Sequence, residues 1–409
     1  MAEYDNVPSR ASVKVDKFEL SIPDEQISDL KTLLRLSPLA PETYENLHTD
    51  DGKFGVSYEW MKKAKEHWLN KYDWRKVETY NNSFPNYIAH VKDDDGETYR
   101  MHFAALFSKQ ENAIPILYMH GWPGSHLEFL DILNLYRKKY SPEELPYHVI
   151  AATLPGWTLS SGPPLTRDFD TLDVARLMNK LMHGLGFGSG YVIQGGDIGS
   201  FTGKVMIGVY DECKGDRCQK VNFAAQNEMP PGVDESQFTE AEKHAMETRA
   251  KAFYTTGIGY AKEHGTRPAT IGFALSASPL SLLAWIGEKF IEWTDVTPPL
   301  DQILDSISLY WFTQSFARCI YTYREYSAVP GGRVLPHSDP KYNNRKPIAW
   351  SWYPKEVFPV PKAWAVAQDM NLVLFRQHEV GGHFAVMEQP EEMMQDMEDF
   401  LQKIGWPLK

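Results

Sequence analysis

The stretch Tyr191-Val192-Ile193-Gln194-Gly195-Gly196-Asp197-Ile198-Gly199 decides the fold of this 409-residue chain. A short apolar run followed by Gly-Gly-Asp-x-Gly is typical of a nucleophile elbow, a sharp strand-to-helix turn that lifts one side chain clear of a sheet. Glycines on both sides of Asp197 allow that turn, because glycine tolerates positive φ. Most elbows carry serine. A carboxylate is poorly suited to acyl transfer, but it can attack an sp³ carbon and form a covalent alkyl ester. The motif therefore points to epoxides or alkyl halides as substrates.

Composition restricts the class of protein further. Hydrophobic residues make up 43% of the chain, which indicates a globular protein, and the net charge is -12. The isoelectric point near 5.6 argues against nucleic acid as a partner. Aromatic residues make up 13%. They fit either large aromatic cores or an aromatic-lined pocket for an apolar ligand.

The three cysteines, Cys213, Cys218 and Cys319, match neither a disulfide framework nor a zinc pattern. The polar N-terminus has no signal-peptide pattern, and no window approaches 18 consecutive apolar residues. We therefore expect a soluble cytoplasmic protein without a membrane anchor and without a bound metal.

The chain divides into three parts by pattern. Residues 1–97 form an N-terminal module with helices expected at 23–36 and 57–72. Residues 98–228 and 337–409 alternate between strand-like and helical stretches, which predicts an α/β core with buried parallel strands and crossover helices. Residues 229–336 are rich in helix formers, with helices expected at 241–254, 278–293 and 304–326, and are interpreted as an inserted cap that closes a pocket. The expected core strands are 114–119, 148–154, 191–195, 221–225, 364–367 and 372–375.

An elbow nucleophile needs a base, and the base needs an orienting acid, in the chain order nucleophile, acid, histidine. His383 lies in Gly381-Gly382-His383-Phe384, directly after the last strand-like run, and is the favoured base; His378 is the competitor. Glu356 fits the position of the acid, and Asp369 is its rival.

A second motif, His120-Gly121-Trp122-Pro123-Gly124-Ser125, follows the apolar strand at 114–119. A loop at this place in such folds supplies a backbone N–H to an oxyanion hole. The expected donors are the N–H groups of Trp122 and Ile198. A cis Trp122-Pro123 bond would suit the tight turn.

Together, the elbow at 195–200, the loop at 120–125 and the Gly-Gly-His-Phe at 381–384 resemble the microsomal-type epoxide hydrolases, and the soluble fungal members most closely. The resemblance covers nearly the whole chain. It implies an α/β-hydrolase core, an inserted helical cap and an N-terminal lariat-like module that wraps the core. It also favours a homodimer.

The same resemblance implies two cap tyrosines that donate hydrogen bonds to the epoxide oxygen. Tyr323 matches one motif and Tyr260 the other, with Tyr254 and Tyr321 as alternatives. The acid of the family, Asp or Glu, falls at Glu356. The reaction expected from the resemblance converts an aryl or alkyl epoxide and water to a vicinal diol, with no cofactor. The sequence does not separate a detoxifying role from a biosynthetic one.

Two other functions are weighed against this one. A haloalkane dehalogenase forms the same aspartyl ester but needs halide-binding donors, often directly after the nucleophile, where this chain has Ile198. A non-catalytic ligand-binding protein would be expected to lose the nucleophile, the base or the oxyanion loop, and all three motifs are present.

Overall fold

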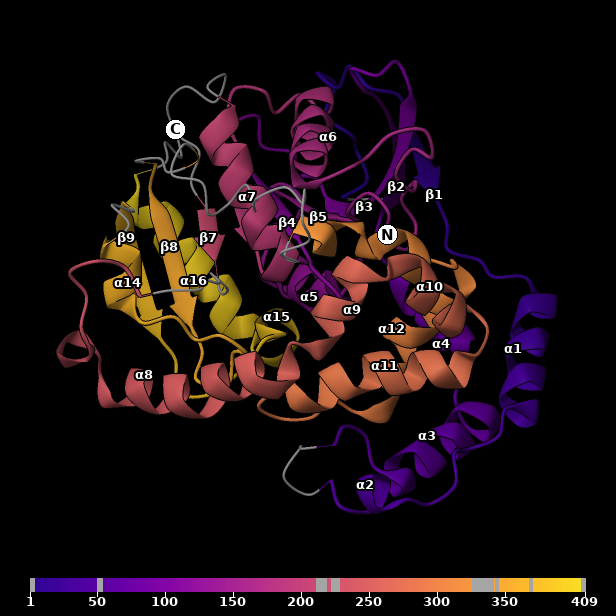
Figure 1. Ribbon diagram of the computed structural model, residues 1–409. Coiled ribbons are helices and arrows are strands. Elements are labelled where there is room, and N and C mark those ends of the chain that lie inside the picture. Colours follow the sequence, from indigo (N-terminus) through magenta and orange to yellow (C-terminus); the bar gives the residue numbers. More distant parts are fainter. Residues whose placement is uncertain are drawn as a thin grey trace.

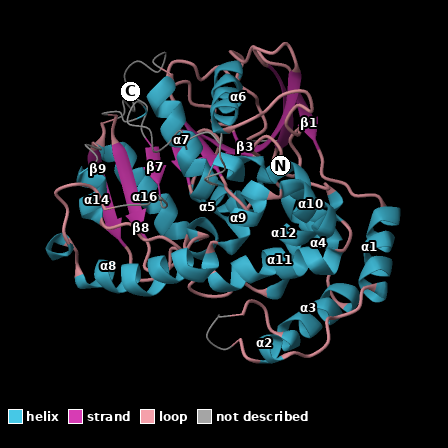
Figure 2. Cartoon of the chain, in the orientation of Figure 1, coloured by secondary structure: helices cyan, strands magenta, loops and turns pink. Residues whose placement is uncertain are grey.

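The computed structural model describes residues 4–49, 54–210, 219–221, 229–325, 342, 346–367 and 371–405. Over these residues the strands form one sheet in the order β1-β2-β3-β5-β4-β6-β7-β8-β9 (Figures 1 and 2). Pairing is antiparallel from β1 to β5 and parallel from β5 to β9. The strands are β1 (Val15–Phe18), β2 (Asn86–Lys92), β3 (Thr98–Leu106), β4 (Ile114–Met119), β5 (Tyr147–Ala152), β6 (Val192–Gly195), β7 (Gln219–Val221), β8 (Ile348–Trp352) and β9 (Leu372–Gln377).

The two faces of the sheet are covered by different helices, and alternate residues of β4 show it. Ile116 and Tyr118 belong to the core cluster that contains residues of α5 (Leu130–Lys139) and α16 (Pro390–Lys403). Leu117 and Met119 belong to the cluster with α6 (Thr171–Gly184) and α7 (Asp197–Val209). Side chains of a strand alternate between faces, so β4 is buried on both sides, as expected for a parallel sheet between helix layers. This is an α/β-hydrolase core.

Most predicted strands are confirmed within one or two residues. Positions 222–225 lie outside the described residues. The strand predicted at 364–367 is wrong: these residues belong to helix α14 (Lys362–Ala367), which follows Pro361. Short buried apolar runs do not distinguish strand from helix by periodicity, and this alanine-rich run favours helix. The strand between β7 and β9 is β8, which the pattern analysis did not predict.

The inserted segment forms a helical cap, which Figure 1 shows along the lower side of the sheet. The helices predicted at 241–254 and 278–293 are confirmed, the first with π-helical turns. The helix predicted at 304–326 is wrong as one element, because the chain turns at Gln314, whose φ is +49°. The cap elements are α8 (Glu240–Ala245), π turns Met246–Ala250 and Phe253–Gly257, α9 (Gly259–Thr266), α10 (Pro268–Ser276), α11 (Pro279–Glu292), α12 (Leu300–Phe312), α13 (Phe316–Cys319) and a 3₁₀ segment Ile320–Glu325.

The N-terminal residues contribute both to the sheet and to the outside of the cap. Strands β1 and β2 extend the sheet beyond β3. The Trp68 indole N–H donates to Ser308 Oγ at 3.1 Å and the Tyr72 hydroxyl to Asp305 Oδ1 at 2.9 Å, both on α12. The described N-terminal residues therefore contact both the sheet and the cap. The helices here are α1 (Asp24–Leu36) and α3 (Tyr58–Asn70), both predicted, together with α2 (Tyr44–Leu47) and α4 (Trp74–Asn82).

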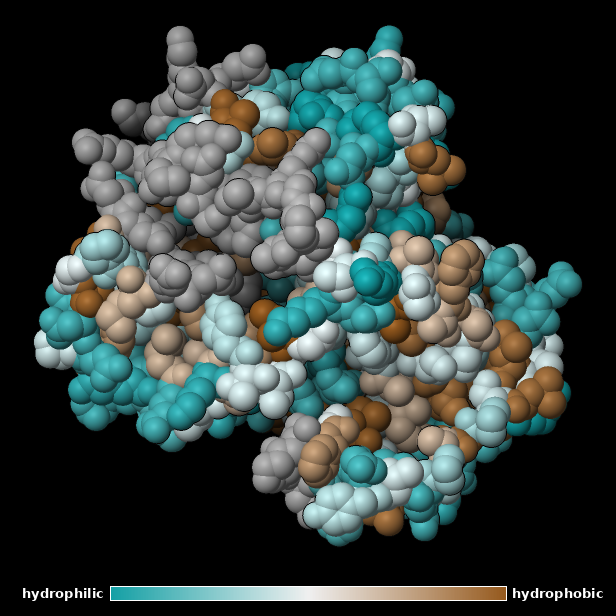
Figure 3. All heavy atoms as spheres, in the orientation of Figure 1, coloured by the Kyte–Doolittle hydropathy of each residue, from teal (hydrophilic) through white to brown (hydrophobic). Residues whose placement is uncertain are grey.

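The surface in Figure 3 is mixed, with apolar patches between polar ones. Exposed apolar side chains include Leu36 on α1 and Phe273 on α10. In the described part of the chain, no single helix has the length and apolar character needed to cross a bilayer; α10 and α11 reach that standard only as a pair bent by 116°.

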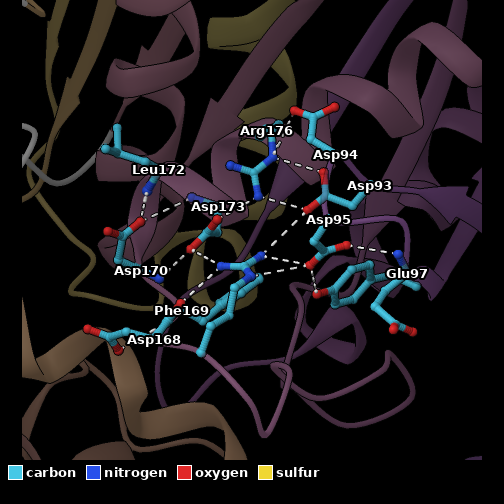
Figure 4. Close-up of polar contacts among 12 residues, drawn as sticks. Asp93, Asp94, Asp95, Glu97, Asp168, Phe169, Asp170, Leu172, Asp173 and Arg176 are labelled. Carbon is cyan, nitrogen blue, oxygen red and sulfur yellow. Dashed lines mark hydrogen bonds and ion pairs between the residues drawn. The ribbon is translucent and has the colours of Figure 1, made fainter.

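A network of carboxylates and guanidinium groups fixes the β2–β3 turn against the start of α6 (Figure 4). Asp93, whose side chain is fully buried, accepts two hydrogen bonds from Arg176, at 2.8 Å from Nε and 2.7 Å from Nη2. Lys180 Nζ lies 3.1 Å from the same carboxylate. Burial alone would raise the pKa of Asp93, but the hydrogen bonds from Arg176, the Asp94 backbone and Lys180 outweigh it and hold that pKa well below its ordinary value.

Replacing Arg176 by methionine is expected to destabilise the fold by about 3 kcal/mol, because it leaves a buried carboxylate without its main partner. Since the folded-state pKa of Asp93 is depressed, its stabilisation is present above about pH 4 and is lost as the pH falls below that value. The free energy of unfolding, from urea titrations at pH 7 and pH 3, measures both effects. Lys14→Met, which removes an exposed ion pair to Asp16, is the control and should leave the free energy of unfolding close to that of the wild type. An equal cost at both pH values would contradict this account.

Candidate active site

Asp197 lies at the turn from β6 to α7, where its φ is +45°. The turn is possible because its neighbours are glycines: a Cβ on Gly199 would lie 2.3 Å from the carbonyl oxygen of Met119, and one on Gly195 would lie 2.4 Å from that of Gly199. A non-glycine residue at positive φ is uncommon and strained. The backbone therefore presents the Asp197 carboxylate at the carboxyl end of the sheet.

The loop after β4 holds one oxygen of this carboxylate. The Trp122 N–H donates to Asp197 Oδ1 at 2.8 Å, and the Ile198 N–H also hydrogen-bonds to the carboxylate. A Cβ on Gly121 would lie 2.1 Å from Oδ1, so only glycine permits this close approach. The Trp122-Pro123 bond is cis, as predicted. The two amides that were expected as oxyanion donors therefore both hydrogen-bond to the Asp197 carboxylate.

His383 and Glu356 face the other side of Asp197. His383 Nε2 lies 3.6 Å from Asp197 Oδ2, and Nδ1 lies 2.5 Å from Glu356 Oε1. Glu356 Oε1 also accepts the Val357 N–H at 2.7 Å. The His383 backbone N–H donates to the carbonyl of Trp293 in the cap at 2.8 Å. A carboxyl from the loop after β8 and an imidazole from the loop after β9 thus meet the elbow.

The charges of this group are coupled. Burial would lower the pKa of His383, but the carboxyls of Glu356 and Asp197 outweigh it and raise that pKa to about 9. Burial raises the pKa of Asp197, opposed by the His383 charge and by the two amide hydrogen bonds. The imidazole is therefore charged at neutral pH as long as Asp197 is an anion.

The rival residues lie elsewhere or outside the described residues. His378 Nε2 lies 2.8 Å from Asp396, Nδ1 lies 2.9 Å from Glu392, and its ring stacks on Tyr353. Asp369 lies outside the described residues. Of the two candidate histidines, the structure brings only His383 to Asp197.

The two cap tyrosines lie over the oxyanion loop. The Tyr260 ring, from α9, stacks on Trp122 with centroids 5.0 Å apart, and the Tyr323 ring meets Trp122 edge-on at 5.9 Å. Tyr323 also hydrogen-bonds to the Tyr260 hydroxyl. Burial, with a further contribution from the Asp197 charge, raises the pKa of Tyr260 well above its ordinary value. The Tyr260 phenol is therefore a neutral donor near Asp197, with the Tyr323 hydroxyl beside it.

The alternative tyrosines are placed differently. The Tyr321 hydroxyl donates to the carbonyl of Pro155 at 2.7 Å. Tyr254 is 38% exposed and packs against Phe358. Neither has a hydroxyl placed beside Tyr260 and Tyr323 in the contacts described.

Two neighbours of the site were not predicted from the sequence. Trp293, at the end of α11, packs its ring 5.1 Å from His383 and 5.2 Å from Tyr260. Glu128 borders the same cavity as Asp197 and His383. Glu128 lies three residues after the oxyanion loop, and an acidic residue so close to that loop is a signal for the site in the sequence. Trp293 has no comparable signal in the sequence.

Comparison with known proteins places these motifs in a family. Residues 15–129 match the model described as Epoxide hydrolase N terminus, and residues 114–257 match that of the alpha/beta hydrolase fold. A "Putative epoxide hydrolase" of Dothistroma septosporum is 41% identical over 405 residues, which cover 98% of this chain and 93% of the relative.

Solved structures agree with these matches. The Aspergillus niger epoxide hydrolase superposes with a TM-score of 0.91 at 46% identity, covering 98% of this chain and 100% of that one. The juvenile hormone epoxide hydrolase of the silkworm Bombyx mori shares the fold, with a TM-score of 0.77 at 22% identity over 96% and 95% of the two chains. The chain belongs to the microsomal-type epoxide hydrolase family.

Proposed function

We propose that this enzyme converts epoxides to vicinal diols through a covalent alkyl ester on Asp197. One observation supports the proposal above all others. The amides of Trp122 and Ile198 hold one side of the carboxylate, and its second oxygen lies 3.6 Å from His383 Nε2. A carboxylate held in this way can act first as a nucleophile and later as an ester carbonyl whose oxygen is already bound.

In the first step, Asp197 Oδ2 attacks one epoxide carbon and the carbon–oxygen bond of the ring breaks. Tyr260 and Tyr323 donate hydrogen bonds to the ring oxygen as it becomes an alkoxide, which stays attached to the substrate and takes up a proton at the expense of the charged His383 imidazole. Trp122 and Trp293 border the tyrosines and give an apolar surround. We therefore propose aryl or alkyl epoxides as the substrate class.

In the second step, His383 removes a proton from water, and the water oxygen attacks the ester carbonyl carbon of Asp197. The Trp122 and Ile198 amides stabilise the charge that develops on Oδ1. Ester formation removes the Asp197 anion, which is one of the charges that raise the pKa of His383. The imidazole therefore becomes a neutral base at the stage when a base is needed, and Glu356 orients it.

A haloalkane dehalogenase is the second candidate, because the indole Nε1 of Trp122 is buried and makes no hydrogen bond within the described residues. Such a donor suits a halide. The two phenols beside it favour an epoxide oxygen, which needs proton donors. The test is turnover of a panel of styrene-type epoxides, terminal alkyl epoxides and chloro- and bromoalkanes. Diol formation with no halide release supports the proposal; halide release without diol formation would contradict it.

Replacing both tyrosines by phenylalanine is expected to lower the rate of ester formation by about 10³-fold, and each single replacement by about 10- to 100-fold. The phenol oxygens are lost while the rings that pack on Trp122 remain. Single-turnover kinetics with a reactive epoxide measure the effect. Tyr321→Phe is the matched control, because its hydroxyl donates to Pro155 instead. A double variant that forms the ester at the wild-type rate would remove these residues from the mechanism.

A further inference from the structure

Glu128 is an acid with a buried carboxyl oxygen that the proposed chemistry does not use. It lies in the 3₁₀ turn His126–Phe129, directly after the oxyanion loop. Its Oε1 is buried and makes no hydrogen bond to any described residue, while a backbone hydrogen bond from Ser125 anchors the carboxyl group. A Cβ on Gly124 would lie 2.3 Å from Oε1. The absence of a side chain at Gly124 therefore creates the space that the Glu128 carboxyl occupies.

A cavity of about 20 Å³ lies beside this carboxyl, bordered by Glu128, Asp197 and His383. A single ordered water needs about 10–15 Å³ and two to four polar partners. The cavity therefore has the size for one water and the polar walls to hold it. It is far too small for a substrate.

Glu128 also borders a second, outer groove of about 260 Å³ between α4, α5 and α12, together with Tyr72 and Asp305. Glu128 as a whole is half-buried for this reason, although its Oε1 is not accessible. Glu128 thus borders both the small cavity and the outer groove.

We propose that this cavity holds the water that hydrolyses the ester, and that Glu128 positions that water together with His383. The inference rests on the proposed ester mechanism and names the group that mechanism lacks, a second partner for the water. His383 Nε2 is one partner, and Glu128 Oε1 is the other.

In ester hydrolysis, the two hydrogens of the water begin on different partners. One hydrogen of the water passes to His383 Nε2, and the other hydrogen-bonds to Glu128 Oε1. The water oxygen bonds to Cγ of Asp197, the bond from Cγ to the substrate oxygen breaks, and the leaving alkoxide takes the proton from His383. The Asp197 carboxyl group now carries the oxygen and the second hydrogen of the water, and transfer of that proton to His383 Nε2 restores the carboxylate and the charged imidazole. Glu128 neither gains nor loses a proton overall.

The charge state of Glu128 fits this role. Burial raises its pKa to about 8, opposed by His383 and reinforced by Asp197. The group is therefore mainly a neutral carboxylic acid at pH 7, so it offers an acceptor oxygen without placing a second full negative charge against Asp197.

The experiment compares Glu128→Leu with Glu128→Gln by rapid-quench kinetics that follow ester formation and ester hydrolysis separately. Leucine removes both polar atoms and is expected to slow hydrolysis by about 10- to 100-fold, the effect of losing one buried hydrogen bond, with ester formation within about 2-fold of wild type. Glutamine keeps a carbonyl oxygen and should recover hydrolysis to within about 5-fold. Glu143→Leu, at an exposed ion pair with Lys109, is the control.

A second variant tests the position without removing the acid. Gly124→Ala should displace the Glu128 carboxyl and slow hydrolysis as leucine does. The proposal is overturned if ester hydrolysis keeps its wild-type rate in Glu128→Leu and Gly124→Ala. It is also overturned if Leu and Gln variants lose both steps equally, which would indicate a structural role only. If wild-type protein forms diol without any ester on Asp197, the proposed function fails as well, and that result is distinct from the others.

Discussion

Replacing Asp197 by asparagine is expected to lower epoxide turnover by about 10⁴-fold or more, because an amide cannot act as the nucleophile. Asparagine is the informative replacement. It keeps the shape of the side chain and tolerates the +45° φ at this position better than other residues do. The substitution also removes a buried charge, so the protein should remain folded. Steady-state diol formation on freshly prepared protein measures the loss.

Two comparisons make this result specific. Asp301→Asn, at a side chain that is 63% exposed on α12, should leave turnover unchanged. The Asp197→Asn protein should still bind the epoxide, since the phenols and the oxyanion amides remain. An Asp197→Asn enzyme that keeps a tenth of wild-type turnover, with its mass showing intact asparagine, would exclude Asp197 as the nucleophile.

His383→Gln is expected to lower steady-state turnover by about 10³-fold or more, because the second step loses its base. The first step should survive, so one equivalent of epoxide is consumed rapidly before the reaction stops. The His383 charge lowers the pKa of Asp197. Loss of the His383 charge should therefore raise the pKa of Asp197, so that ester formation needs a higher pH. Rapid-quench measurements between pH 6 and pH 9 test both statements.

The competing histidine is the control. His378 is paired with Asp396 and Glu392, away from the elbow, and His378→Gln should keep the wild-type burst and steady state per folded molecule. If His378→Gln and His383→Gln had equal effects, the assignment of the base would be wrong.

Local motifs made much of this fold and site predictable. The backbone geometry of the elbow, of the oxyanion loop and of the Gly-Gly-His-Phe motif is determined by a few adjacent residues in each case. Their glycines mark the positions where the backbone must turn sharply or pack closely against a neighbouring segment. The position of Glu356 depends on β8, which the pattern did not predict. Its rival Asp369 was supported by a strand at 364–367 that is a helix instead. Short apolar runs have no periodicity that separates the two structures.

Contacts between distant elements were beyond the reach of pattern analysis. Tyr260 and Tyr323 were selected among 21 tyrosines only by family resemblance. The contact between the Trp293 ring and the His383 ring depends on how the cap packs on the core. The turn at Gln314, after α12, depends on the same packing. Such placements follow from packing over the whole molecule rather than from local propensity.

The most direct test is mass spectrometry of His383→Gln after brief exposure to a reactive aryl epoxide, with peptide mapping of the elbow. The account predicts that the peptide containing Asp197 gains the full mass of the epoxide, in about one copy per enzyme, and that Asp197→Asn in the same background gains none. A folded His383→Gln protein that shows no adduct, although the wild type converts the same epoxide to diol, would contradict the covalent mechanism.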